Sequence, residues 1–329
     1  MKITKALIFL PAILVLLVAG SCSNDKKKLG GLTYDMARKS LNEKYPKLPT
    51  DEIFRQASSG RLYNELKDRY RRGLNDLAIE TDRDGAKLVV VVMSPDVGRA
   101  LSLSNTSGIP YIVQLCNTMG IDCLDMTPIL ASQHANSTGQ SASEGNFSKG
   151  GAAVVAEQLS YLMLTYDCFK NNKKFPAGPK PETFGDAEPN KKEVIDEEKG
   201  VKYYLTTNSQ GLRMDHNVTF PKKKQTIYFM GNAQIYSPLL DDNSIATHML
   251  QEKYPAKEII NAGYLNYTIE DFAGQYVEKG RFTEPDVVVL CTSGEDILSN
   301  FFTQRNRFAR SKKIYKPSPA EEEFYLHLN

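Results

Sequence analysis

Histidine is scarce in this sequence and tryptophan is absent, which limits the chemistry open to the chain. Of 329 residues four are His and none is Trp. The sequence has no His-Glu-x-x-His pattern and its five cysteines form no Cys-x-x-Cys pair, so we expect neither a catalytic metal nor a bound cofactor. A formal charge of +2 without a long basic face argues against a nucleic-acid partner.

The first residues predict an exported protein. Two lysines precede an apolar run over 6–18, which is too short to span a bilayer and has the shape of a secretory signal. Small residues then lead into Cys22, in a pattern that resembles the cleavage box of bacterial lipoproteins. We predict a signal peptide over 1–21, a lipid on Cys22 and a tether over 22–32. The chain would then be anchored to a membrane of the bacterial cell envelope, facing the periplasm or the cell surface; an ordinary signal peptide is the alternative.

Export also bears on the remaining cysteines. A disulfide between Cys116 and Cys123 is possible in an oxidising compartment, and a pair of free thiols is the alternative. Cys291 lies in an apolar run, where buried free thiols are common.

Short apolar runs predict a parallel β-sheet. Continuous hydrophobicity, rather than alternation, is typical of strands that are covered by helices on both faces. Helical patterns lie between these runs and before the first of them, most clearly over 152–163 and 61–79. We therefore predict a single doubly wound, flavodoxin-like α/β domain with a five-stranded parallel sheet. Its strands are expected at 88–93, 121–124, 226–230, 258–261 and 287–291.

One stretch interrupts this alternation. Residues 167–199 combine a proline-rich segment with a charged run, and we interpret them as a surface linker. A division into two domains here would leave two strands on one side and three on the other, and such small parallel sheets are not expected to stand alone. The prediction is one domain over 33–329, assembled from 33–166 and 200–329.

Several short blocks carry a family resemblance. Residues 207–213 (Thr-Asn-Ser-Gln-Gly-Leu-Arg), 231–233 (Gly-Asn-Ala), 261–263 (Asn-Ala-Gly) and 294–296 (Gly-Glu-Asp) resemble successive blocks of the SGNH (GDSL) hydrolases. Residues 144–151 (Glu-Gly-Asn-Phe-Ser-Lys-Gly-Gly) resemble the acid and histidine block, which that family places last. The halves thus stand in circularly permuted order, as in alginate O-acetyltransferase-like relatives. The resemblance implies an SGNH-hydrolase-like fold.

The same resemblance implies that the catalytic groups are replaced. Ala233 stands where the family has its nucleophilic serine, Asn146 where it has its histidine and Glu144 where it has its aspartate. Glu295 replaces an oxyanion-hole asparagine, and only Gly263, whose amide is the second donor, is kept. Acyl transfer needs a hydroxyl, a proton acceptor and oxyanion donors, so we expect a pseudo-hydrolase without turnover.

Polar groups at the strand ends are suited to binding a glycan, an acylated saccharide or another small polar ligand, with tyrosines as an apolar wall. They could equally cap helices and satisfy turns. The residues expected to bind are Glu144, Asn146, Asn232, Gln234, Gly263, Glu295 and Asp296.

Two other function classes remain open. The first is an active carbohydrate esterase or O-acyltransferase, with Ser237 or Ser293 as a relocated nucleophile and His134 or His216 as its base. The second is a scaffold that binds a protein partner in the envelope. Esterase activity would favour the first class, and co-purification of a partner would favour the second.

Overall fold

The computed structural model of the chain describes residues 60–94, 108–135, 141–143, 146–166, 179–196, 202–298 and 319–320. The predicted signal peptide, Cys22 and Glu144 lie outside these ranges. Within them, no helix combines the length and the hydrophobicity needed to cross a membrane.

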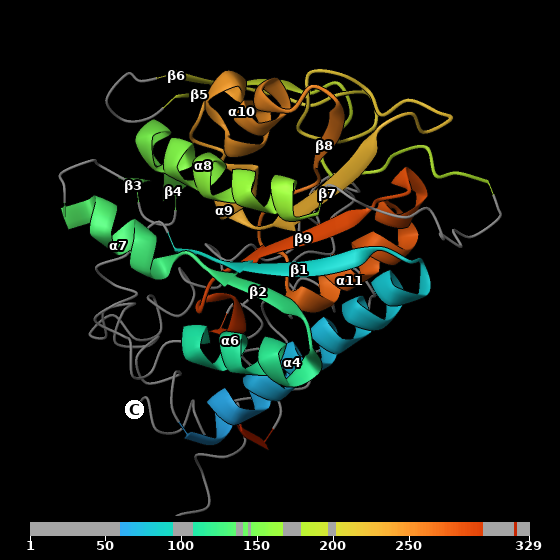
Figure 1. Cartoon of the computed structure of the whole chain (residues 1–329). Helices are drawn as coiled ribbons and strands as arrows, with labels where there is room; N and C mark the ends of the chain where they lie inside the picture. The colour runs from blue at the N-terminus through green and yellow to red at the C-terminus, as the bar shows by residue number, and fades with distance from the viewer. Residues whose placement is uncertain are drawn as a thin grey trace, which may run out of the picture.

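Five parallel strands form the central sheet, in the order β2-β1-β9-β7-β8 (Figure 1). Every pairing between neighbours is parallel. Valine dominates β1 and β9, because β-branched side chains suit an extended backbone that is buried on both faces. The sequence prediction of five strands is confirmed to within a few residues at each end. The strands are β1 (Lys87–Val92), β2 (Asp122–Asp125), β7 (Gln225–Gly231), β8 (Lys257–Asn261) and β9 (Val287–Thr292).

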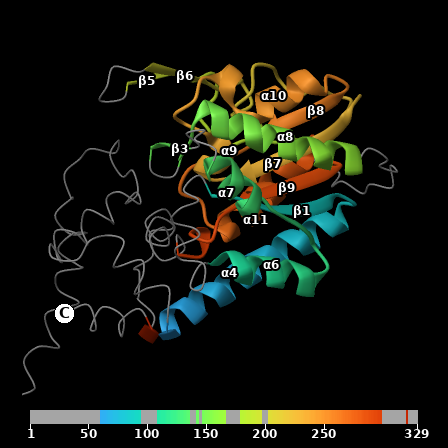
Figure 2. The same cartoon turned by 60° about the vertical axis from the view of Figure 1, so that its left-hand side comes forward.

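The strand order confirms the permuted fold. Counted from β7 with the chain ends joined, the strands follow as β7, β8, β9, β1 and β2. Across the sheet from β8 to β2, the strands of this renumbered series lie in the order second, first, third, fourth and fifth. This is the flavodoxin-like order. Residues 319–320 lie beside the start of α4 in both views (Figures 1 and 2), and Ala320 shares a core cluster with Leu62. The chain therefore has a flavodoxin-like α/β fold in circularly permuted order, as the sequence predicts.

Helices cover both faces of the sheet (Figure 2). One face carries α4 (Gly60–Arg83), α6 (Gly108–Met119) and α11 (Ile269–Glu278). The other face carries α7 (Thr127–Ala135), α8 (Lys149–Thr165) and α10 (Ala246–Lys253).

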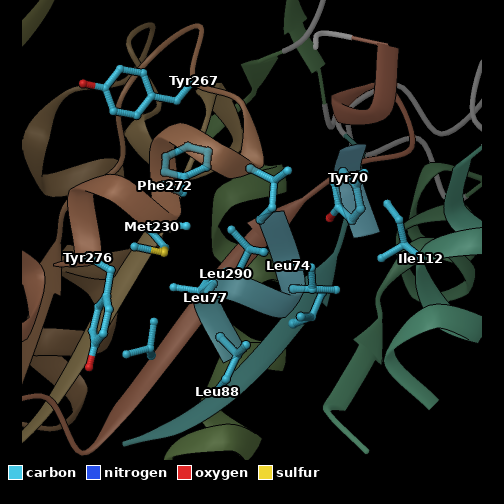
Figure 3. Close-up of a cluster of buried hydrophobic side chains, with 14 of the residues drawn as sticks. Tyr70, Leu74, Leu77, Leu88, Ile112, Met230, Tyr267, Phe272, Tyr276 and Leu290 are labelled. Atoms are coloured by element: carbon cyan, nitrogen blue, oxygen red, sulfur yellow. The ribbon is translucent and has the colours of Figure 1, made fainter. Parts of the chain in front are cut away.

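Alternate residues of each strand point to opposite faces, so one strand contributes to two cores. Leu88 and Val90 of β1 join the core under α4, whereas Val89 and Val91 join the core under α8. Figure 3 shows the first of these cores, where Leu88 lies among side chains of α4, α11 and the neighbouring strands. Because β1, β7, β8 and β9 are almost wholly buried, these four strands appear in the sequence as continuous apolar runs. The edge strand β2 is only partly covered.

The interpretation of 167–199 as a surface linker is wrong for part of that stretch. Phe184 is 4% exposed, and its carbonyl oxygen accepts a hydrogen bond from the hydroxyl of Tyr228 at 3.2 Å. Further on, β5 (Lys192–Asp196) pairs in antiparallel fashion with β6 (Lys202–Thr206). Phe184 thus packs against the core although its neighbours in the sequence are mostly polar. The composition of the segment does not reveal this burial. Residues 167–178 and 197–199 lie outside the described ranges.

Candidate functional site

The turn after β7 determines where Ala233 lies. β7 ends at Gly231, and α9 (Ala233–Tyr236) begins two residues later. A Cβ atom on Gly231 would lie 2.5 Å from the carbonyl oxygen of Cys291, so only glycine lets β7 approach β9 this closely. The first residue of α9 therefore lies at the carboxyl edge of the sheet, and Ala233 offers only a methyl group there.

The side chain of Asn232 links three segments at this edge. Its Oδ1 accepts from the amide of Tyr267 at 2.9 Å, and its Nδ2 donates to the carbonyl oxygen of Tyr267 and to Oδ1 of Asp296, both at 2.9 Å. Both amide protons are therefore used within the protein. The structure favours the alternative role for Asn232, which is to satisfy the turn rather than to bind a ligand.

Asp296 follows the end of β9, and its carboxyl oxygens also accept hydrogen bonds within the protein. Its Oδ2 accepts from the amide of Ser293 at 2.6 Å and from the hydroxyl of Thr292 at 2.9 Å. Burial raises the pKa of this carboxyl, although the hydrogen bonds from Ser293, Asn232 and Thr292 act in the opposite direction. Asp296 thus belongs to the framework of the site.

The amide of Gly263 is also occupied. It donates to Oδ1 of Asn261 at 3.0 Å, while Nδ2 of Asn261 donates to the carbonyl oxygen of Ile235 and to the hydroxyl of Thr247. The expectation that Gly263 keeps an oxyanion donor is therefore wrong, because the neighbouring asparagine already accepts that proton. A Cβ on Gly263 would lie 2.8 Å from the amide nitrogen of Tyr236, so this position serves the close packing of α9.

Arg213 holds the segment that follows α9, a role that motif reasoning missed. The guanidinium is buried and donates to the carbonyl oxygens of Tyr236 and Ser237, and to that of Leu240 at 2.6 Å. It also lies 3.3 Å from Oδ1 of Asp242 in η1 (Asp242–Ser244). Only the resemblance of residues 211–213 to a family block pointed to this arginine, and nothing in the sequence indicated its partners.

The hairpin of β3 (Ser141–Ser143) and β4 (Asn146–Phe147) approaches the site from the other half of the sequence. Cα atoms of β4 lie within 8 Å of Cα atoms of α9, so the strand that carries Asn146 lies beside the helix that begins at Ala233. Asn146 is half-buried there. Glu144 lies outside the described residues.

Two further predicted residues differ in exposure. Gln234 is 8% exposed, and its buried Oε1 has no hydrogen-bond partner among the described residues. Glu295 is exposed to solvent. Within α9, Gln234 is thus a predicted ligand-binding residue whose Oε1 accepts no hydrogen bond from the described residues.

Tyrosine rings continue from α9 along the same edge. The centroids of Tyr236 and Tyr264 lie 6.3 Å apart, and those of Tyr264 and Tyr267 lie 4.8 Å apart. Tyr264 is half-buried, whereas the other two are nearly covered. This aromatic row, Tyr236, Tyr264 and Tyr267, therefore presents one partly accessible ring beside α9.

The serines proposed as replacement nucleophiles are both buried. Ser237 is 4% exposed and its hydroxyl lies 3.4 Å from the carbonyl oxygen of Gln234. Ser293 is also 4% exposed, with its hydroxyl 3.4 Å from Oδ2 of Asp296. A nucleophile must reach its substrate, and neither hydroxyl is exposed enough to do so in this conformation.

The described imidazoles are engaged elsewhere. Nε2 of His216 lies 2.9 Å from Oε1 of Glu258 near the amino end of β8, and Nδ1 lies 2.5 Å from Oδ1 of Asp215. His248 of α10 faces Glu252 at 3.5 Å. The expectation that His216 could serve as a base at α9 is wrong, because its partner marks the opposite end of the sheet. The side chain of His134 and all of His327 lie outside the described residues.

A small depression at the edge of β8 lies apart from the predicted binding residues. Its walls come from the segment after Arg213, from η1 and from α10, and they include His216, His248 and Asp242. None of the seven residues expected to bind a ligand lines it.

Comparison with known proteins gives distant structural matches only. No family model matches the sequence, and no curated protein matches it significantly. The structure is similar to the O-acetyltransferase domain of Pseudomonas putida AlgJ, with 13% identity and a TM-score of 0.45 over 81% of this chain and 91% of that one. It is also similar to Pseudomonas aeruginosa AlgX, with 14% identity and a TM-score of 0.37 over 73% of this chain and 61% of that one. Neither likeness identifies a reaction or a substrate for this chain.

Proposed function

We propose that the protein binds a glycan or another small polar ligand at the carboxyl edge of its sheet and does not hydrolyse it. The observation that carries the proposal is the methyl group of Ala233 at the start of α9. An acyl-enzyme needs an attacking oxygen, and this position supplies none. The resemblance gives Asn146 the position of the base, and β4, which carries it, lies beside α9. An amide does not accept a proton near neutral pH.

The groups that remain available suit a saccharide. The buried Oε1 of Gln234 is an acceptor that a ligand hydroxyl would satisfy after a local movement that exposes it, and an unmet buried acceptor costs about 1–3 kcal/mol. The half-buried ring of Tyr264 offers an apolar surface to the CH groups of a sugar. A few polar groups beside an aromatic wall are typical of small-molecule sites.

The proposal includes a lipid on Cys22 that holds the domain at an envelope membrane. Metabolic labelling with a radioactive fatty acid tests this part directly. Labelling of the natural chain, and its loss in Cys22→Ser, is the expected result; unlabelled natural protein would leave an ordinary signal peptide.

Binding is tested with a glycan array, followed by calorimetry on the best ligand. We expect Gln234→Leu to weaken binding roughly tenfold, since one hydrogen bond of about 1.4 kcal/mol is lost. Gln114→Leu is the matched control, because Gln114 is exposed on α6. Equal affinities in the two variants would contradict the assignment of the site to α9.

Turnover is tested with p-nitrophenyl acetate and acetylated saccharides. We expect no hydrolysis above buffer by the natural chain or by Ala233→Ser, because the base is also replaced. Hydrolysis by the natural chain would contradict the proposal.

A second candidate is an active esterase or acyltransferase that uses Ser293. Its hydroxyl lies 3.4 Å from Oδ2 of Asp296, and burial raises the pKa of this carboxyl, which makes it a stronger proton acceptor than an ordinary aspartate. This candidate requires a movement that exposes Ser293. Loss of any measured activity in Ser293→Ala, with retention in Ser237→Ala, would favour it over a non-catalytic role.

A further inference from the structure

The hairpin of β5 and β6 is attached to the body of the protein along the outer edge of β6. The amide of Tyr204 donates to Oδ1 of Asp241 at 2.8 Å, and the amide of Thr206 donates to Oδ2 of Asp242 at 3.0 Å. Both carboxylates lie at the start of η1. The hairpin forms a two-stranded sheet of its own at the margin of the described part of the chain (Figure 2).

The outer edge of β5 differs from that of β6. Among the described residues, β5 pairs with β6 and with no other strand. The carbonyl oxygen of Lys191 accepts from the amide of Thr207 at 3.0 Å, so the odd-numbered residues of β5 bond to β6. The alternate residues, Lys192, Val194 and Asp196, direct their backbone N–H and C=O groups away from β6. β5 thus presents a row of backbone donors and acceptors on its outer edge.

Apolar side chains lie at the centre of the hairpin. Val194 is 52% exposed, and Tyr204, which lies opposite it in the register, is 58% exposed. Directly opposed residues share one face of a strand pair, so the two side chains form one apolar row across the hairpin. A β-branched residue beside an aromatic ring is a favourable cross-strand pair, and a further strand would extend this row.

The sequence of β5 is complementary to itself. Residues 192–196 read Lys-Glu-Val-Ile-Asp. When two copies run antiparallel with Val194 opposite Val194, Lys192 of each copy lies opposite Asp196 of the other. Directly opposed residues of opposite charge stabilise a strand pair. A parallel pairing in register would bring identical charges together, and a shift of two residues would separate Lys192 from Asp196.

We propose that β5 pairs with β5 of a second copy of this chain, antiparallel about a twofold axis at Val194, and so forms a four-stranded sheet across a homodimer. The backbone groups of Lys192, Val194 and Asp196 would make the hydrogen bonds of the new pair. The apolar row would run from Tyr204 of one copy through both Val194 side chains to Tyr204 of the other. The contact is one strand pair wide, so we expect a weak, concentration-dependent dimer.

Sedimentation velocity of the full chain tests the association. The natural chain should change from monomer to dimer as its concentration rises, with or without a glycan ligand. A chain that remains monomeric throughout would overturn the proposal and would leave the β5 edge to a partner of another sequence. A dimer that is unchanged by Val194→Pro would also overturn it, because proline removes the amide that lies at the axis.

Cross-linking tests the register. In Val194→Cys the two new thiols would lie on Cα atoms about 5.5 Å apart, within the span of a disulfide. Mild oxidation should therefore give a covalent dimer joined at residue 194. Tyr204→Cys is the matched control, because Tyr204 is equally exposed but three strand spacings, about 14 Å, from its copy. A covalent dimer of Tyr204→Cys, or none of Val194→Cys, would contradict the register.

Charge exchange between two variants tests the pairing of Lys192 with Asp196. Lys192→Glu alone and Asp196→Lys alone should each dimerise about tenfold more weakly than the natural chain, because both opposed pairs become repulsive. An equal mixture of the two variants should associate more tightly than either alone, since a mixed dimer opposes Glu to Lys and Asp to Lys. A mixture no tighter than its components would overturn the antiparallel assignment.

Discussion

Asn232 and Asp296 share a hydrogen bond across the carboxyl edge of the sheet, from Nδ2 of the asparagine to Oδ1 of the carboxyl at 2.9 Å. The two residues belong to different strand ends, after β7 and after β9. The bond joins the turn that begins α9 to the turn that follows β9. Asn232 and Asp296, which were both expected to bind a ligand, are thus part of the framework that holds α9 in place.

This framework predicts a pH-dependent effect of Asp296→Asn. Burial raises the pKa of Asp296 in the folded state above its ordinary value of 3.8. Its stabilising contribution is therefore complete below that value and is lost as the pH rises through the folded-state pKa. We expect the natural chain to lose free energy of unfolding relative to Asp296→Asn as the pH rises above 3.8. Urea unfolding of both proteins at a series of pH values measures this, and a pH-independent difference would contradict it.

Arg213→Met should be strongly destabilising. The substitution leaves several buried carbonyl oxygens after α9 without their donor, and such losses cost about 1–3 kcal/mol each. We expect a loss of at least 3 kcal/mol in the free energy of unfolding, measured by urea titration. Arg71→Met is the control, because Arg71 is exposed and its pair with Asp68 spans 3.5 Å; it should cost less than about 1 kcal/mol.

His216→Gln should remove a pH dependence at alkaline pH. Glu258, and then Asp215, raise the pKa of His216 from 6.5 to about 9 in spite of partial burial. The stabilisation is complete below pH 6.5 and is lost as the pH rises through about 9. The natural chain should therefore lose stability over this interval more steeply than the variant does. Parallel denaturation curves at pH 6 and pH 9.5 provide the measurement, and NMR titration of the ring gives an independent value.

Gly263→Ala tests the close packing of α9. The added Cβ would lie 2.6 Å from Cγ2 of Ile235 and 2.8 Å from a backbone nitrogen, so we expect a loss of about 1–3 kcal/mol. Gly274→Ala is the matched control in α11, where nothing lies within 4 Å of the new Cβ. It should stabilise the protein by up to about 1 kcal/mol, since glycine disfavours a helix interior. Thermal unfolding of both variants decides the point, and a neutral Gly263→Ala would show that α9 can shift.

The sheet could be predicted from sequence because its signal is local. Runs such as 88–93 and 287–291 are buried on both faces, and their hydrophobicity is continuous in the sequence itself. Phe184 lacked such a signal, since it stands in a polar stretch and is buried by contacts far away in the chain. The arrangement of Asn232 with Asp296 was expected at the strand ends, but their mutual hydrogen bond was not.

Composition and local pattern determined the α/β class, the five strands and the identity of the groups at the strand ends, among them Ala233, which carries no hydroxyl. Tertiary structure alone decided how those groups are used. A hydrogen bond depends on positions in three dimensions, and residues such as Asn261, Gly263 and Arg213 find their partners only when separate strands and turns meet. The sequence therefore indicates which polar atoms are present, whereas the fold decides which of them are already bonded within the protein.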